Sequence, residues 1–243
     1  MEDKVEEVYN QRCADVYDQW FAYFDEAAVD VLEGLAGGGR ALELGIGTGV
    51  VALPLAARGV EVHGIDASPE MVAALRVKPG GDALPVTMGD FAEVNVAGEF
   101  SLVYVVYNTL FALQTQEEQV RCFRNVAARL APGGTFVIEA FVPDLGQLSA
   151  GRGVRVLHMT DERVGIRVYE HDPVGQKMKS RQVIFGDGGT RVFPVEVRYA
   201  WPSELDLMAR LAGLRLRERW GDWRRAPFDA KSEKHVSVYE RPA

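Results

Sequence analysis

Short apolar runs alternate with longer stretches of helical periodicity between residues 40 and 142. The stretches that begin near Thr48, Ser68 and Thr115 carry apolar residues every three or four positions and open with capping signals, which predicts helices. The runs predict buried strands, at residues 41–44, 60–65, 84–88, 100–106 and 135–141. Strands that alternate with helices predict an α/β protein, a parallel sheet with right-handed crossovers and helices on both faces.

Two further regions have a different pattern. Residues 3–35 carry apolar side chains at helical spacing and predict two helices. Residues 145–199 hold four short β-like runs separated by Gly and Pro, which predicts an antiparallel β insertion after the fifth strand. From residue 200 the chain returns to the core, with Ser203 as the N-cap of a helix and two final strands near 214–220 and 236–241. We therefore divide the chain into 1–36, a core of 37–144 and 200–243, and the insertion 145–199.

Composition narrows the choice of partners. The chain has 243 residues and a net charge of −8, which disfavours nucleic acid and anionic membranes as partners. It contains no apolar run of membrane-spanning length, and its first residues, MEDKVEEVYNQ, lack a signal-peptide pattern, so we expect a cytoplasmic protein. Its two cysteines, Cys13 and Cys122, are far apart and predict ordinary thiols, with neither a disulfide nor a metal site. Strand edges in the insertion favour a homo-oligomer.

Three glycines lie between the first strand and the following helix. Gly45, Gly47 and Gly49 would let the backbone approach a ligand closely, and the second strand ends at Asp66, which suits a ribose diol. A dinucleotide fingerprint would have G-x-G-x-x-G, whereas Val50 follows Gly49 here, which argues against NAD.

Five separated segments together resemble the class I S-adenosylmethionine-dependent methyltransferases. They are ALELGIGTG, VHGIDASPEM, MGDF, FSLVYVVYNTLFAL and LAPGGTFVIEAF, in that order. The resemblance implies a Rossmann-like, mostly parallel sheet of seven strands whose last strand is antiparallel. It also implies S-adenosyl-L-methionine as cofactor and S-adenosyl-L-homocysteine as product.

The resemblance assigns the cofactor residues position by position. It puts Gly45 and Gly47 under the methionine part, Asp66 on the ribose hydroxyls and Met71 against the adenine. Asp90 would accept a hydrogen bond from the adenine amino group, beside the backbone of Phe91. The remaining members of the implied cofactor-binding set are Glu43, which supports the loop, and Tyr17, Ala67 and Tyr107.

The N-terminal VYNQRCADVYDQWFAYF resembles the helical lid of small-molecule methyltransferases, with Tyr17 and Asp18 as its Tyr-Asp pair. Tyr9, Tyr17 and Phe111 resemble an aromatic trio in N-methyltransferases of lincosamide-antibiotic biosynthesis. The insertion and RYAWPSELDLMARLAGL resemble amino-sugar N-methyltransferases. We accordingly assign acceptor-side, catalytic roles to Tyr9, Tyr17, Asn108 and Phe111, with the insertion as a substrate cap or an oligomer contact.

Whether the methyl acceptor needs a general base distinguishes N-methylation from O-methylation. Methyl transfer is an in-line displacement, and a neutral amine already presents its lone pair, whereas a hydroxyl usually needs a base. His63 and His235 are predicted to be structural, while His158 and His171 could reach an acceptor. VVYNTLF also lacks the Asp/Asn-Pro-Pro-Tyr/Phe motif of nucleobase methylation. These residues favour N-methylation of a small-molecule amine without a metal, and the resemblance implies that the acceptor belongs to antibiotic biosynthesis.

Three alternatives remain open. The first is O-methylation of a small hydroxyl compound. The second is a module that binds the cofactor without catalysis, and the third is a dinucleotide oxidoreductase.

Overall fold

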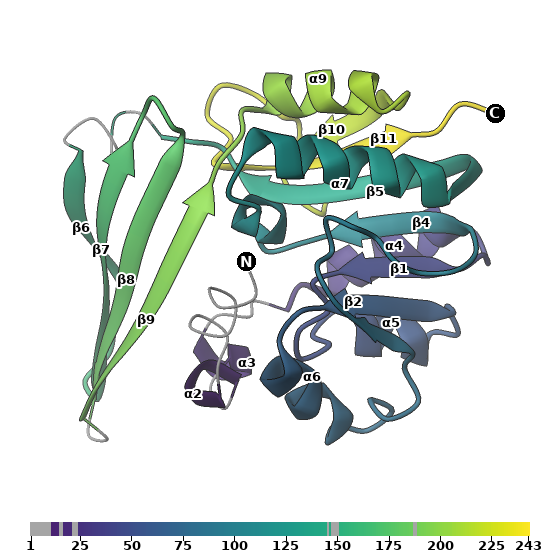
Figure 1. The fold of residues 1–243 in the computed structure, drawn as a ribbon. Helices are drawn as coiled ribbons and strands as arrows, with labels where there is room; N and C mark the ends of the chain where they lie inside the picture. Colours follow the sequence, from purple (N-terminus) through teal and green to yellow (C-terminus); the bar gives the residue numbers. More distant parts are fainter. Residues whose placement is uncertain (1–10, 15–16, 21–23, 145, 147–150, 187–188) are drawn as a thin grey trace.

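The computed structural model describes residues 11–14, 17–20, 24–144, 146, 151–186 and 189–243 (Figure 1). Its main sheet has seven strands in the order β10-β11-β5-β4-β1-β2-β3. The strands are β1 (Ala41–Leu44), β2 (Val62–Asp66), β3 (Val86–Met88), β4 (Phe100–Val105), β5 (Leu130–Phe141), β10 (Arg215–Trp220) and β11 (Lys234–Glu240). Strand β11 runs antiparallel to both β5 and β10, and the pairs among β1 to β5 are parallel. The predicted Rossmann-like sheet is confirmed.

Helices cover both faces of this sheet (Figure 1). On one face, Phe123 of α7 (Gln116–Arg129), Met208 of α9 (Pro202–Leu211) and Phe136 of β5 belong to one continuous apolar core. On the other, Leu32 of α4 and Leu55 of α5 belong to a second core against β1 and β4. The core helices are α4 (Glu26–Ala36), α5 (Ala52–Ala57), α6 (Pro69–Arg76), η1 (Thr109–Ala112), α7 (Gln116–Arg129) and α9 (Pro202–Leu211).

Local capping explains where most of these helices begin. Thr115 and Glu118 form the predicted capping box of α7, and Ser68 accepts a hydrogen bond from the backbone N–H of Met71 at 3.1 Å. Ser203 is not an N-cap, because Trp201 occupies that position and Pro202 is the first helical residue. Helix α5 starts at Ala52 rather than at residue 48, because the intervening residues complete the glycine loop.

The N-terminal region contains more helices than predicted. Besides α4, the described residues form two short helices, α2 (Gln11–Ala14) and α3 (Tyr17–Trp20). In Figure 1 they lie between the main sheet and a second sheet.

The insertion forms that second, antiparallel sheet in the order β6-β7-β8-β9, as predicted. Its strands are β6 (Arg152–Met159), β7 (Arg163–Asp172), β8 (Lys177–Gly186) and β9 (Gly189–Arg198). No helix in the described part of the chain is long and apolar enough to cross a membrane.

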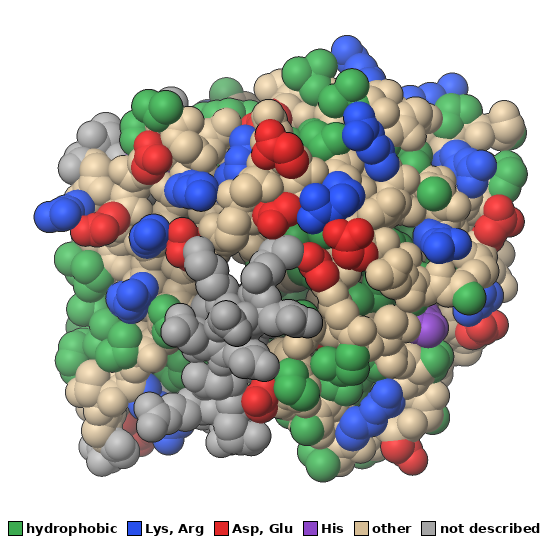
Figure 2. Space-filling model, viewed as in Figure 1, with side chains coloured by type: hydrophobic (Ala, Val, Ile, Leu, Met, Phe, Trp, Pro, Cys, Tyr) green, Lys and Arg blue, Asp and Glu red, His purple; other side chains and the backbone are tan. Residues whose placement is uncertain are grey.

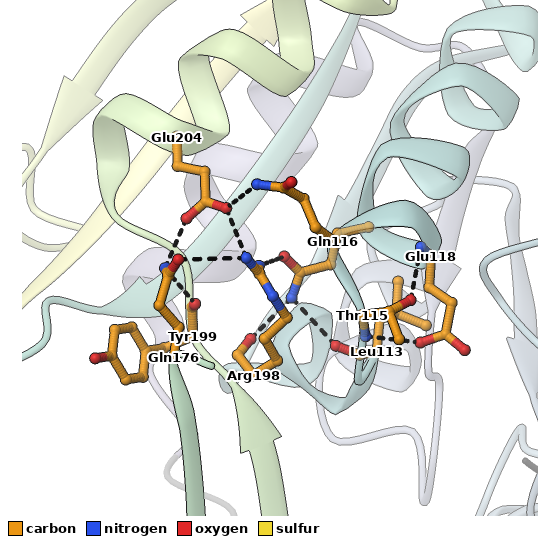
Figure 3. Close-up of polar contacts among 9 residues, drawn as sticks. Leu113, Thr115, Gln116, Glu118, Gln176, Arg198, Tyr199 and Glu204 are labelled. Carbon is orange, nitrogen blue, oxygen red and sulfur yellow. Dashed lines mark hydrogen bonds and ion pairs between the residues drawn. The ribbon is translucent and has the colours of Figure 1, made fainter. Parts of the chain in front are cut away.

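A buried polar network joins the insertion to the core (Figure 3). Arg198, the last residue of β9, donates to Gln119 of α7 at 2.7 Å and to Glu204 of α9 at 2.8 Å. Glu204 also accepts hydrogen bonds from the side chains of Gln116 and Gln176, each at 2.7 Å. The side chains of Arg198 and Glu204 are only 8% and 15% exposed, so this ion pair fixes the base of the insertion at a place that solvent scarcely reaches.

Candidate active site

A cavity of about 500 Å³ opens at the carboxyl ends of β1 and β2, where ligands of open α/β sheets bind. Most of the residues that sequence reasoning assigned to the cofactor line this cavity. They are Tyr17, Gly45, Gly47, Asp66, Ala67, Met71, Asp90 and Phe91. Sequence reasoning missed the other lining residues, Met88, Gly89, Thr109, Ala112 and Leu113.

The two glycines of the loop that border the cavity are in conformations that favour glycine. Gly45 and Gly47 have left-handed φ angles of +73° and +53°. A Cβ at Gly45 would lie 2.5 Å from Cγ2 of Thr109, and one at Gly47 would lie 3.3 Å from Cε of Met71. The loop backbone therefore packs closely against η1 and α6 while it borders the cavity.

Asp66 is the last residue of β2, and its carboxylate accepts hydrogen bonds from two backbone segments. Its Oδ2 accepts a hydrogen bond from the N–H of Gly47 at 2.6 Å, and its Oδ1 accepts one from the N–H of Ser68 at 2.9 Å. Burial raises the pKa of Asp66 above its ordinary value, although the backbone donors oppose that shift. A carboxylate in this position can accept hydrogen bonds from a diol.

The residues around the cavity suit S-adenosylmethionine. The left-handed glycines bring bare backbone to the edge of the cavity, Asp66 offers an acceptor for ribose hydroxyls, and Met71, Phe91 and Leu113 offer apolar surface for a purine. Asp90 also lines the cavity, and its Oδ1 accepts from the N–H of Ala92 at 2.8 Å.

Glu43 does not line the cavity. It is buried on β1, where the hydroxyl of Tyr104 donates to its Oε2 at 3.0 Å. Burial raises the pKa of Glu43 to about 8. Glu43 therefore supports β1, the strand from which the glycine loop starts.

Tyr17 of α3 links the cavity to the insertion. It lines the cavity and packs on a small apolar cluster of Cys13, Ile184 and Phe193, of which the last two belong to β8 and β9. The short N-terminal helices thus lie against the inner face of the insertion sheet.

The neighbouring Asp18 is bound to the glycine loop. The hydroxyl of Thr48 donates to Oδ1 of Asp18 at 2.5 Å, and Lys78 donates to its Oδ2. Lys78 also donates to the carbonyl oxygen of Thr48 at 2.7 Å. Sequence reasoning missed both residues, since Thr48 lies in the ALELGIGTG segment without an assigned role and Lys78 lies outside the five segments.

Three of the residues predicted to act on the acceptor side do not line the described cavity as the cofactor residues do. Tyr9 lies outside the described residues. Tyr107, Asn108 and Phe111 are absent from the described cavity lining, and Phe111 is fully buried against Phe141, with ring centroids 5.1 Å apart. Asn108 accepts from the N–H of Phe141 at 2.7 Å, a contact that supports the backbone, so its direct role toward an acceptor stays a prediction.

No histidine lines the cavity among the described residues. His63 contacts the hydroxyl of Thr87 at 2.9 Å, and burial lowers the pKa of His235 to about 3. His171 contacts the hydroxyl of Tyr199 at 2.9 Å. Within the described part of the chain, no group of three or more His, Cys, Asp or Glu side chains is placed to hold a metal ion.

Comparisons with known proteins agree with this geometry. A family model described as a methyltransferase domain matches residues 41–134. The solved structure of the CcbJ methyltransferase from Streptomyces caelestis is 40% identical, with a TM-score of 0.91 over 98% of this chain and 99% of that chain. Cypemycin N-terminal methyltransferase from Streptomyces sp. is 30% identical over 205 residues, 84% of each protein. CalS10, an amino pentose methyltransferase from Micromonospora echinaspora solved with S-adenosylmethionine bound, shares the fold at 23% identity, with a TM-score of 0.67 over 94% of this chain and 95% of that chain.

Proposed function

This chain belongs to the S-adenosylmethionine-dependent methyltransferases, and from that premise we propose that it methylates a nitrogen atom of a small-molecule acceptor in natural-product biosynthesis. Its cofactor is S-adenosyl-L-methionine and its product S-adenosyl-L-homocysteine. By their names, the cypemycin relative acts at an N-terminus and CalS10 on an amino pentose, both of which present an amine. The cytoplasmic location stays a prediction from the sequence.

The residues that line the cavity have distinct proposed tasks. Gly45 and Gly47 leave room for the methionine part, Asp66 accepts from the ribose hydroxyls, and Met71 and Phe91 enclose the adenine. When bound, S-adenosylmethionine supplies an electrophilic methyl group. The chain then has to hold the acceptor in line with that group and keep water away from both.

No histidine lines the described cavity, and the two carboxylates that do, Asp66 and Asp90, already accept hydrogen bonds from backbone N–H groups, which favours nitrogen over oxygen. A neutral amine attacks through its own lone pair, whereas a hydroxyl acceptor needs a base within hydrogen-bond reach. Tyr17, which lines the cavity, is the proposed orienting residue on the acceptor side. O-methylation remains the alternative.

A matched acceptor screen tests this proposal. Small compounds that differ only in carrying an amine or a hydroxyl are incubated with the protein and S-adenosylmethionine, and S-adenosylhomocysteine release is measured. We expect turnover with an amine and none with its hydroxyl partner. Turnover of the hydroxyl partner alone would instead establish the O-methyltransferase. Thermal protection by S-adenosylhomocysteine but no turnover of any acceptor would favour a binding-only module.

We further propose separate tasks for the two faces of the insertion sheet. The inner face, which contacts Tyr17 through Phe193, caps the acceptor. The outer face is apolar across all four strands, since Val156, Ile166, Val183 and Val192 form one row of paired residues. Figure 2 shows hydrophobic side chains over these strands at the left margin.

A second copy of this chain is the proposed occupant of the outer face. The apolar rows are bordered by residues of both charges, including the Arg152–Glu170 and Lys179–Glu196 pairs. A patch with both charges at its border can pair with itself about a two-fold axis.

A further inference from the structure

Two consecutive residues in the turn between β4 and η1 have left-handed backbone angles although neither is glycine. Tyr107 has a φ of +54° and Asn108 a φ of +66°. Asn adopts this region more readily than most residues, but a bulky residue such as Tyr seldom does. Strain of this kind persists only where the surrounding structure holds it, and it is concentrated at functional sites. The turn therefore needs contacts that hold Tyr107 in place.

The carboxyl end of β5 supplies such contacts. Oε2 of Glu139 accepts a hydrogen bond from the N–H of Tyr107 at 3.2 Å, and the backbone carbonyl of Glu139 accepts one from the N–H of Asn108 at 3.3 Å. Oδ1 of Asn108 accepts a third from the N–H of Phe141 at 2.7 Å. The first of these three bonds is the one that a side chain of β5 makes, and it holds the more strained residue.

The side chain of Glu139 is itself fixed in a nearly buried position. It is 10% exposed, and Nζ of Lys234 on β11 donates to its Oε1 at 3.2 Å. Because the side chain of Lys234 is 44% exposed, solvent can also hydrate its ammonium group. The two carboxylate oxygens of Glu139 therefore contact different kinds of partner, a strained backbone N–H and a partly hydrated cation.

The turn leads directly into a wall of the cavity. Thr109, the residue after Asn108, lines the cavity together with Ala112. A Cβ at Gly45 would lie 2.5 Å from Cγ2 of Thr109, so η1 packs against the bare backbone of the glycine loop. Glu139 is absent from the described cavity lining. A change in the turn would therefore move a wall of the proposed cofactor site, although Glu139 itself lies behind that wall.

We propose that Glu139 is a positioning residue for methyl transfer, which acts on S-adenosylmethionine through the turn at Tyr107. Its Oε2 holds the strained N–H, and the turn then keeps Thr109 and Ala112 against the cofactor. The contact requires an acceptor oxygen at the right reach and does not require the negative charge. This inference rests on the proposed function in its use of S-adenosylmethionine, and it does not depend on which atom accepts the methyl group.

Two conservative variants separate reach from charge. Glu139→Gln loses the charge but keeps an oxygen at the same reach, and the amide has one orientation in which that oxygen faces the N–H of Tyr107. Glu139→Asp keeps the charge, which the long side chain of Lys234 can follow, but draws the carboxylate back by one methylene group. Lys234→Met removes the ion pair and leaves the hydrogen bond to Tyr107. Glu240→Gln is the control, because Glu240 is ion-paired with Arg215 at the opposite end of β11.

The Kd for S-adenosylhomocysteine is measured by calorimetry at a temperature below the Tm of each variant. We expect Glu139→Asp to weaken binding about tenfold, the range of a lost hydrogen bond to a charged group. Glu139→Gln and Lys234→Met should bind within about threefold of wild type, and the control Glu240→Gln should equal it. A role in fold stability alone would change Tm without changing the Kd of the folded protein.

Wild-type affinity of Glu139→Asp overturns the proposal. So does a loss in Glu139→Gln, Lys234→Met or the control that is as large as the loss in Glu139→Asp. The Glu139→Gln and Lys234→Met variants can overturn the proposal even if Glu139→Asp does not fold, because a tenfold loss in either would show that charge matters more than reach. Failure of the proposed N-methylation would appear in the acceptor screen and would leave these Kd values unchanged.

Discussion

The ammonium group of Lys78 donates a hydrogen bond to the backbone carbonyl of Thr48 at 2.7 Å. The same group donates to Asp18, whose other carboxylate oxygen accepts from the hydroxyl of Thr48 at 2.5 Å. A residue that follows α6 therefore connects α3 to the glycine loop. Since Tyr17 precedes Asp18 and lines the cavity, this contact sets the position of an active-site side chain from outside the cavity.

Substituting Lys78→Met should lower kcat/KM by about tenfold, the effect expected when a charged hydrogen bond that orients a reacting partner is lost. The exposed Lys231→Met is the control and should behave as wild type. Steady-state kinetics with both substrates varied provides the measurement. An unchanged kcat/KM for Lys78→Met would show that α3 keeps its place without this contact.

Asp66→Asn should weaken S-adenosylhomocysteine binding by about tenfold to a hundredfold, because charge-assisted hydrogen bonds contribute about 1.5–3 kcal/mol each. Calorimetric titration gives the Kd directly. Asp82→Asn changes an exposed carboxylate after α6 and should leave the Kd as it is. If both variants bind alike, Asp66 serves only to hold the N–H groups of Gly47 and Ser68.

Most residues that the sequence assigns to the cofactor come together at one cavity, because the signals that identify them are local. The strand, the glycine turn and the helix after Asp66 each have a signature within about ten residues, and their common position follows from parallel topology. The predicted family and its seven-stranded sheet are confirmed for the same reason.

Long-range contacts were not predictable in this way. Nothing in the local sequence distinguishes Lys78 from other lysines until the fold brings it to Asp18. Arg198 likewise meets Gln119 and Glu204 only because β9 ends beside α7 and α9. Ser203 shows the reverse error. Its residue type suits an N-cap, yet the helix starts two residues earlier than such a cap implies, with Pro202 at the first helical position, where a fixed φ is favourable.

Glu43 should make stability depend on pH. Its pKa is about 8 in the folded chain against an ordinary 4.5, so the folded state keeps a proton that the unfolded state releases. The free energy of unfolding should therefore fall as pH rises from about 4.5 to about 8, by at most about 1.4 kcal/mol per pH unit, and then level off. Glu43→Gln mimics the protonated form, so urea unfolding at several pH values should show a flatter profile. The exposed Glu117→Gln should keep the wild-type slope, and identical slopes for all three proteins would contradict the assignment.

Arg198→Met should lower the free energy of unfolding by about 3 kcal/mol, because it leaves the partly buried Glu204 with the donors Gln116 and Gln176 but without its cation. Burial alone would raise the pKa of Glu204, but hydrogen bonds from Gln176, Arg198 and Gln116 hold it below its ordinary value. Arg152→Met breaks an exposed pair with Glu170 and should cost less than about 1 kcal/mol. Urea unfolding compares the two. Similar losses would mean that the network shown in Figure 3 contributes no more than a surface ion pair.

The outer face of the insertion should mediate self-association. Val156 and Val192 are 59% and 53% exposed at the two ends of an apolar row, and Met159 in the next row is 75% exposed, so one chain leaves a continuous apolar surface in water. Light scattering after size exclusion should give a mass that is a multiple of 26.8 kDa for wild type.

Val156→Lys puts a charge on that surface, and its mass should fall to that of a single chain, since burying an unpaired ammonium group opposes association. Val174→Lys, in the exposed turn between β7 and β8, adds the same charge outside the apolar rows and should leave the mass unchanged. A wild-type protein that elutes as a single chain, or a Val156→Lys variant that still assembles, would mean that a different surface, or none, joins the copies.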